Sequence, residues 1–235
     1  MKRFFSGESM WRGLELRLLL LLGGIAAAVW GFLGVAEEMA EGETMGVDQH
    51  LMMLLRSHGD PADPIGPRAF EEAMRDITAL GGFTVLTLVT VVATLAFLMH
   101  KRWTHAAVLA GTILLAQASS SLLKSAYARP RPDLVPHGVE VYSASFPSGH
   151  SMLSAATYLT LAALVAHLEV KRRSKVLVFG VAVFLMTAVG LSRVYMGVHW
   201  PSDVLAGWCA GAAWALAAWV VLMRLPDDQP KATAS

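Results

Sequence analysis

Six long stretches without an ionisable residue constrain what this chain can fold into. They are Leu18–Ala36, Ile77–Met99, Ala106–Leu123, Ser151–Ala166, Val176–Ser192 and Val204–Met223. A helix that spans the hydrocarbon core of a bilayer needs about 20 apolar residues, within a range of about 17–25. The fourth stretch has 16 residues and reaches spanning length if His150 and His167 lie near its ends. The pattern predicts an all-α fold, an integral membrane bundle of six transmembrane helices.

Composition excludes several other classes of protein. Hydrophobic residues make up 55% of the chain and charged residues 16%, whereas soluble domains carry about 25% charged residues. A soluble protein with six core helices would also need a polar cover that this chain does not provide. One cysteine excludes an internal disulfide framework and a thiolate metal cluster. A formal net charge of +1 gives no global basic field for nucleic acid.

The stretches and the charges between them predict the topology. We expect one membrane domain over 1–235, with helices at about 14–36, 77–100, 103–124, 148–168, 175–192 and 202–224. With a cytoplasmic N-terminus, 12 of the 19 Lys and Arg residues are cytoplasmic, with the strongest cluster at Lys171–Lys175. The positive-inside rule then places both termini in the cytoplasm. The first stretch could be a signal peptide, but its 19 residues exceed the usual apolar region of about 7–15.

The external loop at 37–76 holds ten of the 18 acidic residues. Asp48 is a candidate cap for a short helix, and Pro67 could begin another one. Both helices would suit the membrane interface, and a solvated loop that covers the bundle is an equal alternative. The tail at 226–235 is expected to be frayed.

Three polar clusters interrupt the apolar chain on the predicted external side. They are Lys124–Pro132, Phe146–His150 and Ser192–Asp203. Ionisable groups at membrane depth indicate a functional site. Three cations of these clusters lie on the external side, which the positive-inside rule disfavours; they are Lys124, Arg131 and Arg193. Three positive charges on separate segments suit a phosphate group, which has several negative oxygens. The helix after Pro147 would add free backbone N–H groups, and Ser148 and Gly149 would let the backbone approach the anion closely.

Two histidines supply candidate chemistry. His199 and Asp203 are four residues apart, so they share one face if this stretch is helical. The carboxylate would fix the tautomer of His199 and support its positive charge, which makes His199 the candidate nucleophile and predicts a phosphohistidine. His150 would protonate the leaving alkoxide and later activate water. In-line displacement at phosphorus needs attack and departure on opposite sides, and two histidines on different helices can meet that requirement.

The three clusters together resemble the signature of the type 2 phosphatidic acid phosphatase superfamily. The family pattern is K-x6-R-P, then P-S-G-H, then S-R-x5-H-x3-D, and the sequence matches it at Lys124–Pro132, Pro147–His150 and Ser192–Asp203. The resemblance implies the same roles: phosphate binding by Lys124, Arg131, Arg193, Ser148 and Gly149, and catalysis by His150, His199 and Asp203. It also implies a reaction without a metal or other cofactor. Taken singly, these cations could be interfacial anchors, the histidines structural and Asp203 a helix cap.

Other positions carry weaker signals. Arg129 lies outside the motif and is at least as well explained as a surface anchor as by substrate contact. Asp133 and His137 are expected to be solvated, and Cys209 to be inert. Gly207 and Gly211 favour internal helix packing over dimerisation. Four tryptophans near predicted helix ends fit an interfacial aromatic belt: Trp11, Trp30, Trp103 and Trp200.

The leading hypothesis is a phosphatase that removes the terminal phosphate from a membrane lipid. The resemblance implies undecaprenyl diphosphate, phosphatidylglycerol phosphate, phosphatidic acid or lipid A phosphates as substrates, without choosing among them. A phosphotransferase would pass the same phosphate to another lipid, and a haloperoxidase is disfavoured because the members with that chemistry are soluble. A transporter is also disfavoured, since the polar residues gather at one interface. We expect a bacterial inner membrane location, and the sequence leaves the oligomeric state open.

Overall fold

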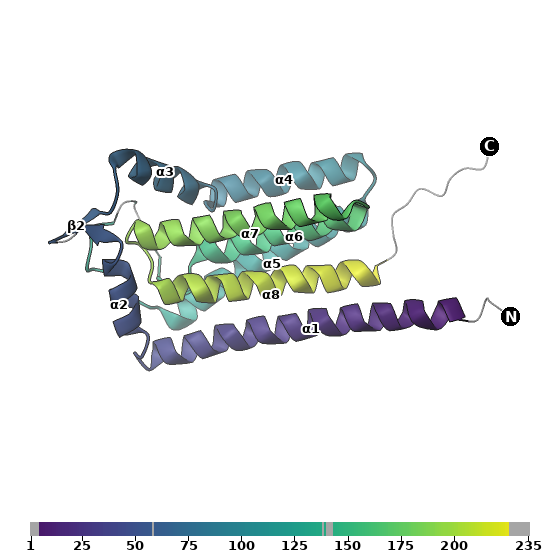
Figure 1. Cartoon of the computed structure of the whole chain (residues 1–235), viewed down its shortest axis with the longest axis horizontal. Helices are drawn as coiled ribbons and strands as arrows, with labels where there is room; N and C mark the ends of the chain where they lie inside the picture. The colour runs from purple at the N-terminus through teal and green to yellow at the C-terminus, as the bar shows by residue number, and fades with distance from the viewer. Residues whose placement is uncertain (1–4, 58, 138, 140–142, 226–235) are drawn as a thin grey trace.

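The computed structural model describes residues 5–57, 59–137, 139 and 143–225, with side chains from residue 15 onward. It is a bundle of roughly parallel and antiparallel helices (Figure 1). The helices are α1 (Phe5–Ala40), α2 (Met45–Met53), α3 (Arg68–Ala79), α4 (Phe83–Met99), α5 (Trp103–Tyr127), α6 (Gly149–Leu168), α7 (Arg172–Tyr195) and α8 (Pro201–Arg224). Two short antiparallel strands, β1 (Arg56–Ser57) and β2 (Asp60–Pro64), lie in the loop before α3. The all-α prediction is confirmed.

The prediction of six spans is confirmed with one change. Five described helices are long and apolar enough to cross a membrane by themselves, namely α1, α5, α6, α7 and α8. Helices α3 and α4, which are bent by 49° at their break, make a sixth candidate span when they are taken as one. A single straight helix over 77–100 is therefore wrong, because residues 80–82 interrupt it.

Packing at the break between α3 and α4 accounts for the bend. The Tyr158 hydroxyl of α6 donates a hydrogen bond of 2.7 Å to the Leu80 carbonyl, which has no helical partner at the end of α3. Gly81 follows, and a Cβ there would collide with the side chain of Val189 on α7. Only a glycine allows the chain to pass this close to α7, so the break sits where α6 and α7 fix it.

Helix α6 forms the centre of the bundle. In its most apolar 18-residue window, 72% of the residues are buried, compared with 33% for α8 and 17% for α7. Helix α8 approaches α6 at two glycines: a Cβ at Gly207 would lie 2.9 Å from Ser151 Cβ, and one at Gly211 would lie 2.7 Å from Ala155 Cβ. The prediction of internal packing at Gly207 and Gly211 is confirmed, and this close contact sets the distance between α6 and α8.

The external loop is partly packed against the bundle. Helix α3 begins directly after Pro67, as predicted. The prediction that Asp48 caps a helix is wrong, because α2 begins earlier, after Thr44, and Asp48 is buried at 1% exposure within it. Arg56 of β1 donates a 2.9 Å hydrogen bond to the Tyr195 carbonyl at the end of α7. The loop therefore covers one end of the bundle and is held there by buried polar contacts.

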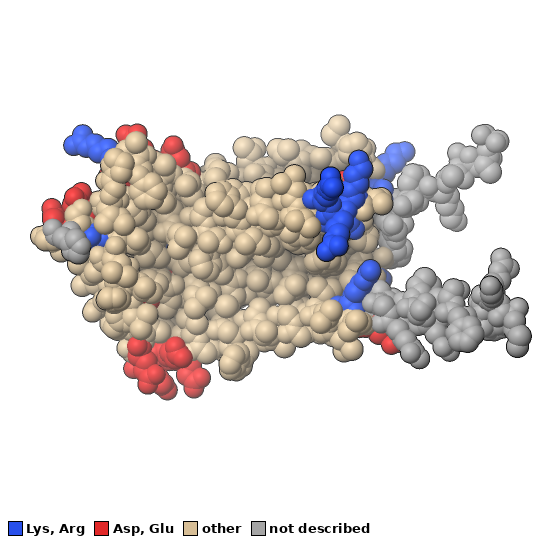
Figure 2. All heavy atoms as spheres, in the orientation of Figure 1, with Lys and Arg blue, Asp and Glu red and all other residues tan. Residues whose placement is uncertain are grey.

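Charge separates the two ends of the bundle. Helix α1 begins and α8 ends at the same end (Figure 1). In Figure 2, Lys and Arg gather at that end and most Asp and Glu at the other. Trp30 and Trp103 are 78% and 64% exposed, as an interfacial belt requires, whereas Trp200 is buried at 4% and does not belong to one. The Trp11 side chain and the tail at 226–235 lie outside the described part of the chain.

Candidate active site

The residues predicted for the site all lie at the end of the bundle that carries the external loop. Four of them are at helix ends: Lys124 in the last turn of α5, Gly149 and His150 at the start of α6, and Arg193 near the end of α7. The other four are Arg131, Ser148, His199 and Asp203, which lie between helices or in the first turn of α8. The close approach of α6 to α8 brings motifs together that are about 50 residues apart in sequence.

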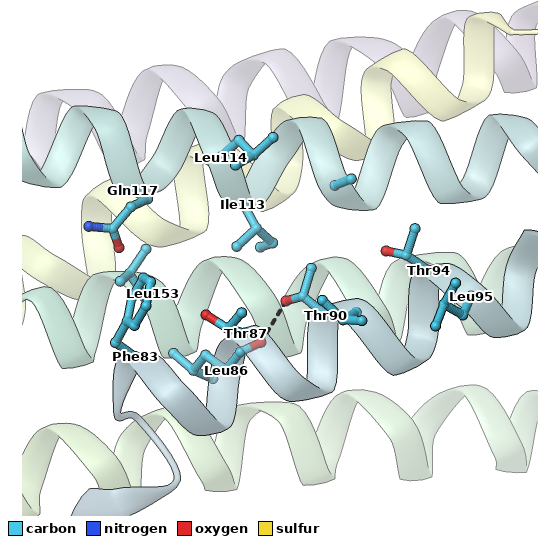
Figure 3. A pocket seen from close by; sticks show the side chains of 12 residues that line it. Phe83, Leu86, Thr87, Thr90, Thr94, Leu95, Ile113, Leu114, Gln117 and Leu153 are labelled. Atoms are coloured by element: carbon cyan, nitrogen blue, oxygen red, sulfur yellow. Dashed lines mark hydrogen bonds between the residues drawn. The ribbon is translucent and has the colours of Figure 1, made fainter.

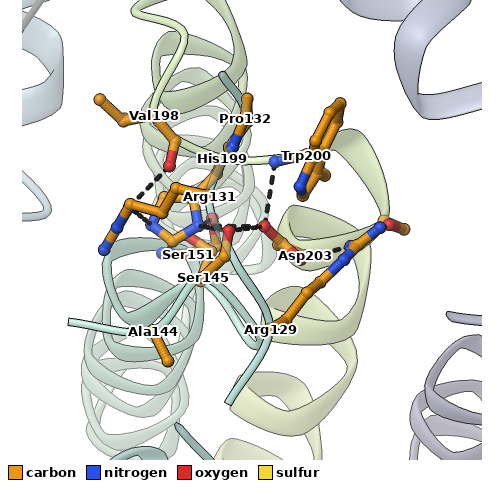
Figure 4. Close-up of polar contacts among 12 residues, drawn as sticks. Arg129, Arg131, Pro132, Ala144, Ser145, Ser151, Val198, His199, Trp200 and Asp203 are labelled. Carbon is orange, nitrogen blue, oxygen red and sulfur yellow. Dashed lines mark hydrogen bonds and ion pairs between the residues drawn. The ribbon is translucent and has the colours of Figure 1, made fainter. Parts of the chain in front are cut away.

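His199 and Asp203 form the centre of the site (Figure 4). His199 Nδ1 lies 3.3 Å from Asp203 Oδ2, and the two residues are 1% and 0% exposed. The same carboxylate oxygen accepts hydrogen bonds from the Trp200 backbone N–H, at 2.9 Å, and from the Ser145 hydroxyl. Because Asp203 caps its own helix through Trp200, the carboxylate has little freedom to rotate away from His199.

Arg131 fixes the tautomer of His199. The guanidinium Nη1 lies 3.1 Å from His199 Nε2 and also donates to the Val198 carbonyl at 2.6 Å. Arginine has only donors, so Nε2 is the acceptor and Nδ1 carries the proton that faces Asp203. The ring nitrogen with the free electron pair therefore points toward the cations of the site.

Burial keeps His199 neutral. It lowers the pKa of His199 to about 3, because a buried imidazolium loses its water, and the nearby cations Arg193 and Arg131 lower it further. The hydrogen bond to Asp203 and the charge of that carboxylate act in the opposite direction. Burial also lowers the pKa of Arg131, with Asp203 again opposing. At neutral pH the imidazole is thus uncharged and has a lone pair on Nε2.

The three predicted cations approach the site from different elements. Lys124 Nζ donates to the Ala144 carbonyl at 2.6 Å, and Arg131 Nε donates to the Ser143 carbonyl at 2.8 Å. Arg193 is 3% exposed and donates to Thr78 Oγ1 at 3.2 Å, while its buried Nε makes no hydrogen bond to the described residues. The charges of Lys124, Arg131 and Arg193 are all near enough to interact with His150. A buried guanidinium with an unused donor indicates a place for an anion.

The start of α6 supplies backbone donors. Ser148 is fully buried; its hydroxyl caps α6 by accepting from Ser151 N, and its N–H donates to the Asp203 carbonyl at 2.9 Å. The following N–H groups, of Gly149 and His150, belong to the first turn and have no partner within the helix. A Cβ at Gly149 would be 3.5 Å from Lys124 Cε, so the lysine stem lies against this turn. The start of α6 and the Lys124 stem therefore lie side by side, and a helix N-terminus beside a cation suits an anion.

Three residues of the site are not predicted by the sequence pattern: Arg129, Ser145 and Asp48. Arg129 is not a surface anchor: it is buried at 6% exposure and binds Asp203 Oδ1 at 2.6 Å and Asp48 Oδ2 at 2.9 Å. Ser145 holds Asp203, as described above. The only sequence signal for Arg129 is that it repeats the Arg-Pro pair of the motif, and an external acidic residue such as Asp48 gives none.

An apolar groove runs along the bundle between two helices. A groove of about 340 Å³ lies between α4 and α5 (Figure 3), with walls that include Phe83, Ile113, Leu114 and Leu153. One wall residue, Leu153, is one turn beyond His150 on α6, so the groove comes near the start of that helix. Among the described residues, no group of three or more His, Cys, Asp or Glu side chains is placed to hold a metal ion.

Comparison with known proteins agrees with this architecture. The chain is 39% identical to phosphatidylglycerophosphatase B of Bacillus subtilis over 144 residues, which are 60% of this chain and 69% of that protein. It is 32% identical to the lipid A 1-phosphatase of Rhizobium johnstonii, of which it spans about half, 52%. The crystal structure of a transmembrane PAP2-type phosphatidylglycerolphosphate phosphatase from B. subtilis superposes with a TM-score of 0.75 at 28% identity, covering 83% of this chain and 93% of that one. The sequence pattern of the PAP2 superfamily matches residues 105–226, and the chain therefore belongs to this superfamily.

Proposed function

We propose that this protein is a membrane phosphatase that hydrolyses the terminal phosphate of a lipid phosphate or diphosphate. The observation that carries the proposal is the neutral, buried His199, whose Nε2 lone pair faces Arg131 while Asp203 holds Nδ1. The named relatives act on phosphatidylglycerophosphate and lipid A, which are both lipid phosphates. The apolar groove between α4 and α5 supports a substrate whose chain stays in the membrane.

The proposed reaction has two displacements at phosphorus. His199 Nε2 attacks the phosphorus atom and the bond from phosphorus to the lipid oxygen breaks. His150, which the negative charge of the bound phosphate keeps protonated, gives its proton to that oxygen. Water then attacks the phosphohistidine, His150 accepts a proton from it, and the P–N bond breaks to release inorganic phosphate. The imidazolium character of His199 increases during attack, and Asp203 stabilises it.

Binding is assigned to the cations and to the start of α6. Lys124, Arg131 and Arg193 neutralise the phosphate oxygens, and the N–H groups of Gly149 and His150 donate to them. Ser148 contributes as the cap that orders this turn. Arg131 Nη1 lies 3.1 Å from the nucleophilic nitrogen, so attack on phosphorus requires that the guanidinium donates to the phosphate instead. The reaction uses no metal, and a chelator is expected to leave phosphate release unchanged.

The charge distribution supports an orientation for this site. Lys and Arg gather at the end where α1 begins, so we place that end in the cytoplasm and the site at the outer face of a bacterial inner membrane. The natural lipid remains one of the four candidate classes. A phosphotransferase that uses the same phosphohistidine is the second candidate, and the ratio of free phosphate to phosphorylated acceptor lipid separates the two.

Replacing His199 tests the mechanism. Purified His199→Ala is expected to fold in detergent and to release no phosphate from a panel of lipid phosphates, whereas a His150→Ala variant is expected to accumulate labelled phosphoenzyme from a substrate with a good leaving group. Such a substrate needs no proton for departure, but its phosphohistidine still needs the base. Full turnover by His199→Ala would refute the assignment of the nucleophile.

A further inference from the structure

A buried polar cluster lies behind Asp203, on the side away from His199. Its members are Asp48 of α2, Arg129 after α5, and Ser202 and Asp203 of α8. Arg129 Nη1 binds Asp203 Oδ1 at 2.6 Å and Ser202 Oγ at 2.8 Å, and its Nη2 binds Asp48 Oδ2 at 2.9 Å. In Figure 4, Arg129 reaches Asp203 from the side opposite to Arg131. All four groups are less than 9% exposed.

We propose that Arg129 and Asp48 are positioning residues that set the orientation and the effective charge of Asp203 for its work on His199. The proposal rests on the function proposed above. Neither residue touches the space for phosphate, and each acts through Asp203. The external helix α2 thereby becomes part of the catalytic centre, although it carries none of the residues of the sequence motifs.

The orientation follows from how the two carboxylate oxygens of Asp203 are divided. Arg129 takes Oδ1, which leaves Oδ2 for His199 Nδ1, the Trp200 N–H and Ser145. A guanidinium is planar and can bind two carboxylates at fixed angles, which a lysine ammonium cannot do. Arg129 therefore locks the rotation of the carboxylate that presents Oδ2 to the histidine.

Asp48 preserves the negative charge next to His199. Arg129 paired with Asp203 alone would cancel the negative charge that stabilises the imidazolium. Asp48 compensates the arginine from its other side, so the three groups together keep one net negative charge next to His199. Asp48 is itself satisfied: Ser202 donates to it from the backbone N–H at 2.8 Å and from the hydroxyl at 2.5 Å. Because the cluster is excluded from water, little screening weakens these interactions.

The experiment compares Asp48→Asn and Arg129→Lys with wild type, using phosphate release from a short-chain lipid phosphate in detergent. Each variant is expected to lower kcat by about 10- to 100-fold, with KM changed less than twofold. Vanadate imitates the five-coordinate transition state, so its Ki should rise in proportion to the loss of kcat. Asp60→Asn and Arg75→Lys are the matched controls, because both residues are exposed and lie in the external loop at 37–76. Both variants should behave as wild type.

The vanadate Ki separates positioning from folding. A variant that only folds poorly has fewer active molecules, which lowers the maximal rate and leaves the Ki of the remaining sites unchanged. An unchanged vanadate Ki or an unchanged kcat in the variants would overturn the positioning proposal. The proposed phosphatase function would still stand in that case, provided that the wild-type protein releases phosphate. A wild-type protein that releases no phosphate from any lipid phosphate would instead refute the function itself.

A double variant tests the charge argument. Asp48→Asn combined with Arg129→Gln removes one charge of each sign and leaves Asp203 with its full negative charge. It is expected to be more active than Asp48→Asn alone, in which Asp203 is the one carboxylate left to pair with Arg129. A double variant no more active than the single one would contradict the role assigned to Asp48.

Discussion

The contact between α6 and α8 gives a prediction whose size can be worked from the structure. A Cβ at Gly211 would lie 2.7 Å from Ala155 Cβ and 3.0 Å from Ala156 N, with the Met152 carbonyl closer still. Carbon atoms in contact need about 3.5 Å or more. Since the neighbours include backbone atoms, Gly211→Ala must push the two helices roughly 1 Å apart.

Gly180 on α7 provides the matched control, because a Cβ there would meet nothing within 4 Å. Both substitutions bring the same gain of about 0.5–1 kcal/mol in helix propensity, so their difference isolates packing. We expect Gly211→Ala to be less stable than Gly180→Ala by about 1–3 kcal/mol. That difference corresponds to roughly 2–12 °C in Tm, measured by thermal unfolding in detergent.

The same separation should affect turnover. Helix α6 carries His150 and α8 carries Asp203, so a shift of roughly 1 Å between them costs up to about 100-fold in rate. Phosphate release by Gly211→Ala should fall while Gly180→Ala stays at the wild-type rate. Equal Tm values and equal rates for the two variants would refute the packing argument.

Three further predictions concern single side chains. His199 has a pKa of about 3 in the folded protein and about 6.5 in the unfolded chain. Its full contribution to stability is therefore present above pH 6.5, and the free energy of unfolding declines by up to about 1.4 kcal/mol per pH unit below that pH. Thermal unfolding measured against pH should show that His199→Gln lacks this part of the decline in acid. Tyr158→Phe removes the hydrogen bond to Leu80 and should cost about 1 kcal/mol, seen as a lower Tm; an unchanged Tm would mean that the bond does not stabilise the break. Ala128 ends α5 with φ of 44°, so Ala128→Gly should raise stability by about 1 kcal/mol, which a lower Tm would contradict.

The sequence predicts well the features that depend on residue type and spacing alone. The apolar stretches gave six spans, because bilayer thickness alone sets their length. The motif positions came together at one end of the bundle, with His199 and Asp203 in contact as their four-residue spacing predicts. Pro67 marked the start of α3 because a fixed φ suits a helix start.

The errors came from residues whose environment is built by distant segments. The local sequence predicts that Asp48 caps a helix, yet its partners are Arg129 and Ser202, which are 81 and 154 residues away. Trp200 was assigned to the membrane interface, but it is buried against Arg129 and donates to the Pro130 carbonyl. Local pattern cannot report such contacts, because the same residue types suit both a surface and a buried cluster.

The sequence by itself determined that the chain is a membrane bundle, and which side chains stand at one end of it. These properties depend on local hydrophobicity, helix length and the period of the helix. Only the tertiary structure decided that α3 and α4 bend at Gly81, that Arg129 faces inward, and that α2 joins the site through Asp48. Such features arise from close approach and charge compensation between distant segments, and those energies exist only once the helices are packed.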